Sequence, residues 1–273
     1  MRFSKKKLRN SINLIKFNII KNSHVSKTPH LASCLSCTDI ITYLYFNIMD
    51  VGKIKKNAKS RDRFILSKGH AAPALFNILA YFNVFNKKKL LNYGKDGSIF
   101  GEHPPHPKSL AGIESATGSL GHGLPTAVGI AIGLKKLKTK SNVYCLIGDG
   151  ECGEGTIWES AIIASANKLD NLILIIDNNG WQATDKTKNI MGKLNFKNKW
   201  KAFNWDVFSI NGNNIDEIHE SFKKINKNNS KPTVIIANTI KGSGVKFMEN
   251  NNNWHYRIPN SKEVQLSKQF LNL

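Results

Sequence analysis

The sequence predicts an α/β fold with a mainly parallel sheet flanked by helices. Residues 143–147 and 172–176 are continuous apolar runs, which are typical of strands buried on both faces, and residues 233–237 predict a third strand. A helical segment from about residue 155 to 168 lies between the first two runs. A buried strand, a helix and a second buried strand in this order predict parallel pairing through a right-handed crossover.

The chain before this unit predicts two helices within residues 1–50, around a loop over 22–29. The first helix shows apolar residues at helical spacing: Leu8, Ile12, Ile15 and Ile19. A short strand is expected over residues 64–67 and a helix over 73–82. Residues 93–123, rich in Gly, Pro and His, are expected to be irregular, and a loop of that length inside a compact domain usually has a function.

The length and composition predict one domain over residues 1–273. With 41% hydrophobic and 22% charged residues, the chain can bury a sizeable core and is too apolar to be disordered. Its longest aliphatic run, residues 172–176, is far shorter than the roughly 20 residues of a membrane helix. We therefore expect no membrane span.

The formal net charge of +21 has two interpretations. A phosphate-rich partner such as nucleic acid would explain it. The lysines, however, are dispersed in short runs, without zinc-finger spacing or a basic repeat, which favours a compositional bias over nucleic acid. In either case a positive field would assist an anionic cofactor or sugar phosphate.

Cys34 and Cys37 form a C-x-x-C pair, which could be redox-active or half of a metal site. The sequence has neither a second such pair nor a His pair that would complete a metal site, since Cys145 falls in a predicted strand and Cys152 in a predicted loop. We interpret the pair as apolar packing on a helix. Free thiols fit a reducing cytoplasm, the expected location.

Two oxygen-bearing side chains follow neighbouring predicted strands. Asp149 stands just after the first strand of the crossover unit and Asn179 just after the second, 30 residues on. Ligands of open parallel sheets bind beyond the carboxyl ends of the strands, where these two side chains should converge. Oxygen donors without Cys or His favour a hard cation such as Mg²⁺. Gly148 and Gly150 would let a phosphate approach the backbone.

A lone Gly-Asp-Gly is an ordinary turn, but its pairing with Asn178-Asn179 after an apolar strand resembles the signature of thiamine diphosphate enzymes. The resemblance extends to the transketolase family over about residues 30–255. Five segments match in family order: residues 61–75, 117–123, 148–155, 168–172 and 241–245. The resemblance implies the thiamine diphosphate-binding fold and a single N-terminal, diphosphate-binding domain.

The resemblance also implies a cofactor site. Asp149 and Asn179 match the family's side-chain ligands of Mg²⁺, and the backbone carbonyl of Trp181 would supply a third. The residues expected to contact thiamine diphosphate are His70, Gly118, Ser119, Leu120, Asp149, Gly150, Asn179 and Lys241.

Histidines on separate loops match the family's sugar site. The resemblance implies catalytic roles for His30, His70, His103 and His255, and substrate binding by His30, Ser33, His70 and His255. Imidazoles suit proton transfer and hydroxyl binding near neutral pH. This sequence departs from the family in two places, with Pro29-His30-Leu31 for Gly-His-Pro and Tyr256 for a Gly. His106 is an alternative to His103.

Glu154 and Glu159 have two interpretations that the sequence leaves open. Acids at these positions join a carboxylate network across the subunit interface in the family. Alternatively, they are favourable charges in the first turns of a helix.

The resemblance covers only part of a transketolase. In the family, a Glu of a second, pyrimidine-binding domain activates the cofactor, and about thirty residues after Lys241 cannot form that domain. We therefore predict the N-terminal subunit of a split transketolase. It would transfer a two-carbon ketol unit between sugar phosphates with a partner chain carrying the pyrimidine-binding and C-terminal domains, as a dimer of such pairs.

Two alternatives to the split transketolase stay open. One is a subunit of another ketol-type thiamine diphosphate enzyme, similar to deoxyxylulose phosphate synthase or to a transferase that makes an unusual sugar. The other is a nucleic-acid-binding protein on a relic of the fold.

Overall fold

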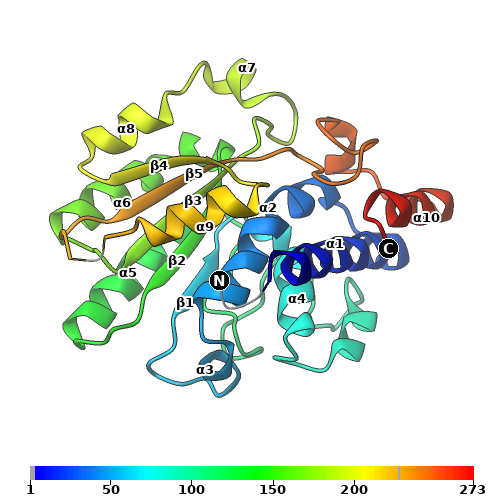
Figure 1. Cartoon of the computed structure of the whole chain (residues 1–273), viewed down its shortest axis with the longest axis horizontal. Helices are drawn as coiled ribbons and strands as arrows, with labels where there is room; N and C mark the ends of the chain where they lie inside the picture. The colour runs from blue at the N-terminus through cyan, green and yellow to red at the C-terminus, as the bar shows by residue number, and fades with distance from the viewer. Residues whose placement is uncertain (1–3, 227) are drawn as a thin grey trace.

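The computed structural model describes residues 4–226 and 228–273, and its centre is a five-stranded parallel sheet (Figure 1). The strands lie in the order β1-β2-β3-β5-β4. Their bounds are β1 Arg63–Leu66, β2 Val143–Gly148, β3 Leu172–Asn178, β4 Asp206–Asn211 and β5 Thr233–Asn238. The predicted α/β class, with a parallel sheet flanked by helices, is confirmed.

The register brings the strand ends to one edge of the sheet. Gly148 at the end of β2 pairs with Asp177 of β3, which in turn pairs with Ala237 near the end of β5. Side chains alternate between the two faces, so Ile173 and Ile175 enter one hydrophobic core while Leu174 and Ile176 enter the other.

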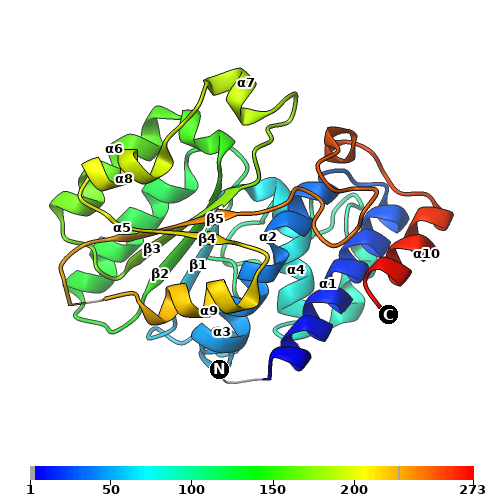
Figure 2. The ribbon, with the colours of Figure 1, turned by 45° about the horizontal axis from the view of Figure 1, so that its top comes forward.

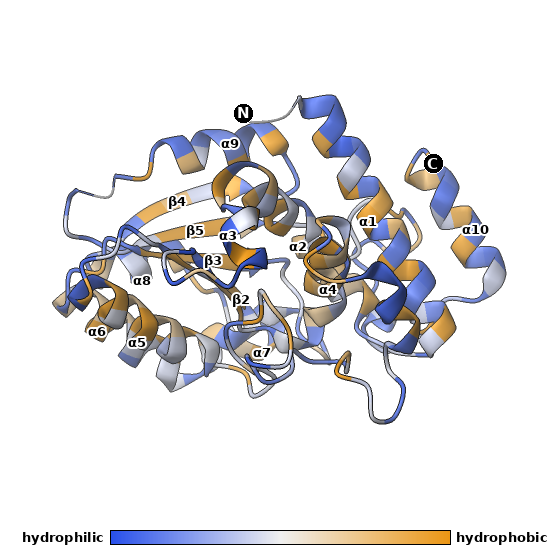
Figure 3. Cartoon of the chain, turned by 90° about the horizontal axis from the view of Figure 1, so that it is seen from below, coloured by the Kyte–Doolittle hydropathy of each residue, from blue (hydrophilic) through white to orange (hydrophobic). Residues whose placement is uncertain are grey.

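Helices cover both faces (Figures 1 and 2). The larger core lies on the side of α1 Lys5–Ser26, α2 Leu31–Tyr43, α4 Ala72–Tyr81, α9 Ile215–Lys223 and α10 Ser261–Phe270. The smaller core lies under α5 Gly123–Lys136, α6 Gly155–Ala166 and α8 Phe196–Ala202. Figure 3 shows hydrophobic residues along the central strands and largely hydrophilic outer surfaces on α1 and α9.

Short helical segments complete the fold. The α-helical ones are α3 Val51–Lys55 and α7 Thr187–Met191, and a π-helical turn, η1 Leu44–Ile48, extends α2. The 3₁₀ turns are η2 Gly69–Ala71, η3 Lys87–Asn92, η4 Gly150–Gly153 and η5 Asn252–His255.

The structure differs from the sequence prediction at several elements. The loop expected over residues 22–29 is shorter, because α1 continues to Ser26 with support from α4, where Asn77 accepts a hydrogen bond of 3.2 Å from Asn22. Cys152 lies in the 3₁₀ turn η4 rather than in a loop. Helix α5 and the edge strand β4 were not predicted, since Gly129 and Gly133 interrupt the first and β4 is mostly half-buried or exposed. Residues 1–3 of the predicted first helix lie outside the described residues.

Helix α2 is the most deeply buried helix near the N-terminus. Every residue from Leu31 to Tyr43 is buried, including Cys34 and Cys37, which are both free thiols packed in the core as predicted. By length and composition alone, Leu31–Ile48 could cross a membrane, but 89% of that stretch is buried inside the protein, as in a core helix. The sequence estimate from unbroken aliphatic runs did not identify this stretch.

Candidate functional site

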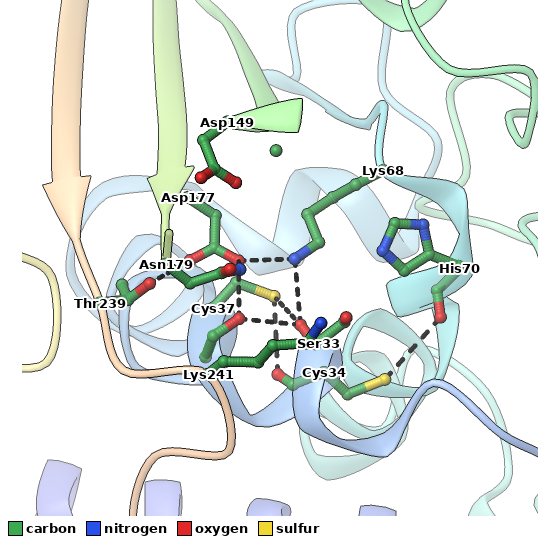
Figure 4. Close-up of polar contacts among 12 residues, drawn as sticks. Ser33, Cys34, Cys37, Lys68, His70, Asp149, Asp177, Asn179, Thr239 and Lys241 are labelled. Atoms are coloured by element: carbon green, nitrogen blue, oxygen red, sulfur yellow. Dashed lines mark hydrogen bonds and ion pairs between the residues drawn. The ribbon is translucent and has the colours of Figure 1, made fainter. Parts of the chain in front are cut away.

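The polar edge of the sheet collects side chains from strands that are distant in sequence (Figure 4). Asp149 follows β2, and the loop after β3 carries Asn179 and Gly180. The amide of Gly180 donates to Asp149 Oδ2 at 3.0 Å, so the two loops are tied together. The structure thus brings the two predicted ligand loops side by side.

Asp149 is a buried carboxylate, 1% exposed. Besides Gly180, Thr187 donates to its Oδ2 at 2.6 Å, and both of these donors are neutral. Burial, together with the nearby Asp177 carboxylate, raises the pKa of Asp149 to about 6, although the Thr187 hydrogen bond opposes the shift. A buried carboxylate held by neutral donors fits a divalent cation, which would favour its ionised form.

Asn179 and Trp181 lie in a tight turn centred on Gly180, whose φ is +77°. The Asn179 side chain donates to Asp177 Oδ2 at 3.2 Å, and its Oδ1 accepts from the amide of Trp181 at 3.0 Å. The Lys186 ammonium lies 5.3 Å from the centre of the Trp181 ring. An amide oxygen has two acceptor positions, so the Asn179 oxygen can still serve as a ligand.

Glycines at the site are required by close approach. A Cβ on Gly150 would lie 3.0 Å from the Gln182 side chain, and one on Gly118, whose φ is +156°, would lie 3.1 Å from the His103 ring. A Cβ on Gly69 would lie 2.8 Å from the backbone of Gly118. The turn before His70 and the predicted cofactor loop therefore pack backbone against backbone.

Four histidines from four separate segments form a cluster. The centroid of the His30 ring lies 5.2 Å from His255, 5.4 Å from His70 and 6.3 Å from His103. His70 and His255 are 5.8 Å apart. His106 is not in these ring contacts and instead accepts from the amide of Lys108, so the structure places His103 rather than His106 in the cluster.

His30 is held in an unusual backbone conformation at the start of α2. Its φ is +68°, in the left-handed region that side chains rarely adopt, and its amide donates to the His255 carbonyl at 2.8 Å. The Glu102 carboxylate lies 3.6 Å from His30 Nδ1, and Ser33 Oγ lies 3.5 Å from His255 Nδ1. Strain of this kind is common at functional sites.

The histidine cluster is electrically neutral around its centre. Burial first, then the nearby basic groups, lower the pKa of His30 to about 4 and of His255 to about 3. Burial and Lys68 lower the pKa of His70 well below its usual value. At pH 7 these three rings are uncharged, so each can donate one hydrogen bond and accept another.

Lys241 is 1% exposed and lies close enough to His30, His255 and Asp149 to interact with each of them electrostatically. Its ammonium donates to the Gln182 carbonyl at 3.0 Å and to Asn252 Oδ1 at 2.7 Å. Burial and then Lys68 lower its pKa to about 8, so a nearby anion would stabilise its charged form.

The remaining predicted residues lie at the rim. Ser119 is exposed, with its hydroxyl 3.3 Å from His122 Nδ1, and Leu120 is 39% exposed. Glu154 and Glu159 are exposed on or beside α6. Glu154 precedes the helix and Glu159 points outward, so both the interface and the plain solvent interpretation stay open.

Sequence reasoning missed several buried residues of the edge. Glu151 accepts from Ser67 Oγ at 2.5 Å and from the amides of Gly121 and Gly148 at 2.9 Å each, which ties three loops together. Lys68 and Asp177 form a buried ion pair of 2.5 Å. Lys68 and Glu151 lie inside segments that resemble the family, but each of the three residues has at least one partner from a distant part of the chain.

A cavity of about 640 Å³ adjoins Asp149 on the α8 side of the sheet. Its lining includes Asn178, Thr187 and Phe196. It also includes four lysines: Lys186, Lys188, Lys193 and Lys197. The Asp149 edge is thus open to solvent on a basic side.

The fold and its polar edge define an α/β domain of the thiamine diphosphate-binding class. Residues 4–273 match the family profile described as the thiamine diphosphate binding domain of transketolase. The chain therefore belongs to the transketolase family and is a component of a transketolase-type transferase.

The relatives in sequence fall into two groups: transketolase subunits of similar length to this chain, and longer transketolases. The chain is 38% identical to one subunit of the apulose-4-phosphate transketolase of Phocaeicola vulgatus, over 90% of this chain and 87% of that protein. It is 37% identical to a 6-deoxy-6-sulfo-D-fructose transketolase subunit of a Clostridium species, over 81% and 80%. Human transketolase is 33% identical over 96% of this chain but only 42% of its own length.

The similar solved structures are also longer transketolases. Transketolase from Campylobacter jejuni superposes with a TM-score of 0.90 at 27% identity, covering 99% of this chain and 43% of that one. Transketolase from Leishmania mexicana, at 22% identity and a TM-score of 0.89, shares the fold. The chain spans less than half of these longer transketolases.

The lowered pKa values of His30 and His255 can be tested by NMR. We expect their ring resonances to titrate near pH 4 and pH 3, and the resonance near pH 4 to disappear in His30→Asn. The unfolded chain takes up protons on these rings near pH 6.5 and the folded chain does not. The unfolding free energy should therefore fall as the pH drops from about 6.5 through 4. Titration of both rings near pH 6.5 would contradict the buried, neutral cluster.

Proposed function

We propose that this chain is the N-terminal subunit of a split transketolase. It would hold thiamine diphosphate through Mg²⁺ and, with a partner chain, transfer a two-carbon ketol unit between sugar phosphates. The observation that carries the proposal is the position of the neutral histidine cluster. It lies close to a buried aspartate edge, and Lys241 interacts electrostatically with His30 and His255 on one side and with Asp149 on the other.

The Asp149 edge would hold the Mg²⁺-diphosphate group. Asp149 and Asn179 would supply side-chain oxygens and Trp181 its carbonyl, and the backbone of Gly150 would lie against the diphosphate. Lys241 and His70 would face the diphosphate. When bound, thiamine diphosphate supplies the nucleophilic carbon that attacks a ketose carbonyl. The loop over Gly118, Ser119 and Leu120 would contact the cofactor from the other side.

The histidines would bind and orient the sugar. Neutral His30 and His255 can each donate to one hydroxyl and accept from another, and Ser33 lies within reach of the His255 ring. His103, at the exposed side of the cluster, would meet incoming substrate first. These groups can also move protons between sugar oxygens at neutral pH.

Anionic sugars are the proposed substrates. The names of two relatives specify a ketose 4-phosphate and a sulfo-ketose, which are both anionic ketoses. The +21 formal charge and the lysines beside Asp149 would attract such substrates. A different ketol-type thiamine diphosphate enzyme is the second candidate. Family membership over nearly the whole chain disfavours a nucleic-acid-binding relic.

A second chain would complete the site. The chain covers 80–91% of relatives that are named as subunits but only 42% of human transketolase. We propose that the partner carries the pyrimidine-binding and C-terminal domains and that two such pairs associate. The four free, buried cysteines support a reducing, cytoplasmic location.

The outer face of α5 and α6 is the proposed docking surface for that partner. Ile162 and Ile163 are 56% and 47% exposed, and Gly129 and Gly133 leave an open strip on α5. This face begins at the cofactor loop, where Thr156 Oγ1 donates to the Gly121 carbonyl at 2.9 Å. A chain seated here would reach the edge of the site, and Glu154 and Glu159 would lie in the contact.

The need for a partner is tested by reconstitution. We expect the purified chain to show no ketol transfer from a ketose phosphate until the C-terminal chain is added, because that chain would supply the activating carboxylate. Ile163→Asp should weaken association at least about tenfold by placing a charge in an apolar contact. Leu137→Asp, at a residue 74% exposed beyond that face, should leave association unchanged. Ketol transfer by the chain alone would overturn the proposal.

The metal assignment is tested by Asp149→Ala. We expect Mg²⁺-dependent binding of thiamine diphosphate by the assembled enzyme to weaken by about 100-fold or more, beyond the roughly 10–100-fold cost of losing an outer-shell partner. Thr187→Val removes only one neutral hydrogen bond to Asp149 and should cost about tenfold, the low end of that range. Calorimetric titration, with thermal unfolding of the metal-free protein as the folding control, measures both. Undiminished affinity in Asp149→Ala would refute the assigned ligand.

A further inference from the structure

The Asp177 carboxylate is the most heavily used acceptor at the strand-end edge. Its Oδ2 accepts from Lys68 Nζ at 2.5 Å, from Ser36 Oγ at 2.6 Å and from Asn179 Nδ2 at 3.2 Å. Thr239 donates to its other oxygen. The carboxylate is fully buried and joins α2, the turn after β1, the loop after β3 and the loop after β5 (Figure 4).

Asp177 is hydrogen-bonded to both residues that are proposed to hold Mg²⁺, to the side chain of Asn179 and to the backbone of Asp149. Its carboxylate fixes the amide group of Asn179, and its backbone carbonyl accepts from the amide of Asp149 at 3.2 Å. Since the Asn179 nitrogen is held by Asp177, the Asn179 oxygen is the atom left to face a cation. Without Asp177, the carboxamide would keep only the hydrogen bond from the Trp181 amide to its oxygen, and its nitrogen could turn towards the cation more readily.

Lys68 extends the same hydrogen-bond network towards the residues that are proposed to bind the sugar. Its ammonium donates to Asp177 and to the Ser33 carbonyl at 3.1 Å, while its neighbour Gly69 leads to His70. One buried ion pair therefore contacts the helix start that carries His30 and Ser33, and also the loop that carries Asn179.

Stability alone does not explain a charged pair at this place. Removing a carboxylate and an ammonium from water is unfavourable, and apolar residues of similar size often stabilise a core equally well. Buried charged side chains have a function where their hydrogen bonds orient another group. The outer-shell partners of metal ligands are an example.

We propose that Asp177, held in place by Lys68, is a positioning residue that orients Asn179 for Mg²⁺. The inference rests on the proposed function, because it assigns a role towards the same cation. Asp177 makes no contact with the metal itself. It acts through the Asn179 amide, and Lys68 fixes the position of the carboxylate by donating to it and to the Ser33 carbonyl of α2.

A double-mutant cycle tests the inference. Asp177→Asn, Asn179→Ala and the combined variant are compared by calorimetric titration of thiamine diphosphate at saturating Mg²⁺ into the assembled enzyme. We expect Asp177→Asn alone to weaken binding about 10–100-fold. In the Asn179→Ala background it should weaken binding less than about threefold further, since its target is already gone. The same loss in both backgrounds would show a merely structural role and overturn the inference.

Folding is controlled in two ways. If Asp177→Asn leaves Lys68 unpaired and the chain unfolds, Lys68→Met with Asp177→Asn removes both charges, and the cycle is repeated with that pair. Asp39→Asn breaks a second buried ion pair, Lys16–Asp39 at 2.5 Å, and should lower thermal stability while changing cofactor affinity less than about threefold. An equal loss of affinity in Asp39→Asn would overturn the inference. A wild-type enzyme that binds no thiamine diphosphate would instead overturn the proposed function.

Discussion

Parallel pairing of five strands is the constraint on which the rest of the molecule depends. Because every strand runs in the same direction, Lys68, Asp149, Asn179 and Thr239 all leave the sheet at one edge, although they are spread over more than half of the sequence. Continuous burial on both faces makes the sheet rigid and pins the register. The turns at that edge are anchored by the strands of the sheet. Their short polar side chains can therefore be held within hydrogen-bonding distance of one another.

The buried charged groups at this edge of the sheet differ in how their charges are compensated. Asp177 is neutralised by Lys68, which also donates to the Ser33 carbonyl, whereas Asp149 receives only neutral donors and has a raised pKa. Lys241 and the histidines beyond them are buried next to positive neighbours, which lowers their pKa values. An anionic group bridged by a divalent cation would satisfy both sides at once, because the cation would meet Asp149 while the anion met Lys241. The electrostatics therefore support the same ligand that family membership indicates.

Much of the fold and of the site can be predicted from the sequence, and the failures have physical reasons. Buried strands are visible as continuous apolar runs, and the spacing from Asp149 to Asn179 predicts their convergence at one edge. Edge strand β4 is not visible in this way, because half-buried or exposed residues such as Asp206 and Ser209 break the run. Glu151 and Asp177 were missed as site residues because their roles arise from contacts 84 to 141 residues away, as in Ser67 to Glu151 and Ser36 to Asp177. Only the fold distinguished His103 from His106.

The chain presents a cofactor edge, a histidine cluster and an apolar helical face that leads away from both. The most direct test of this account is a crystal structure of the chain with its partner chain, thiamine diphosphate and Mg²⁺. The account predicts a metal ion bound by the Asp149 and Asn179 side chains and the Trp181 carbonyl, with the diphosphate against Gly150 and the partner on α5 and α6. A cofactor bound away from this edge, or a diphosphate held there without a metal ion, would contradict it.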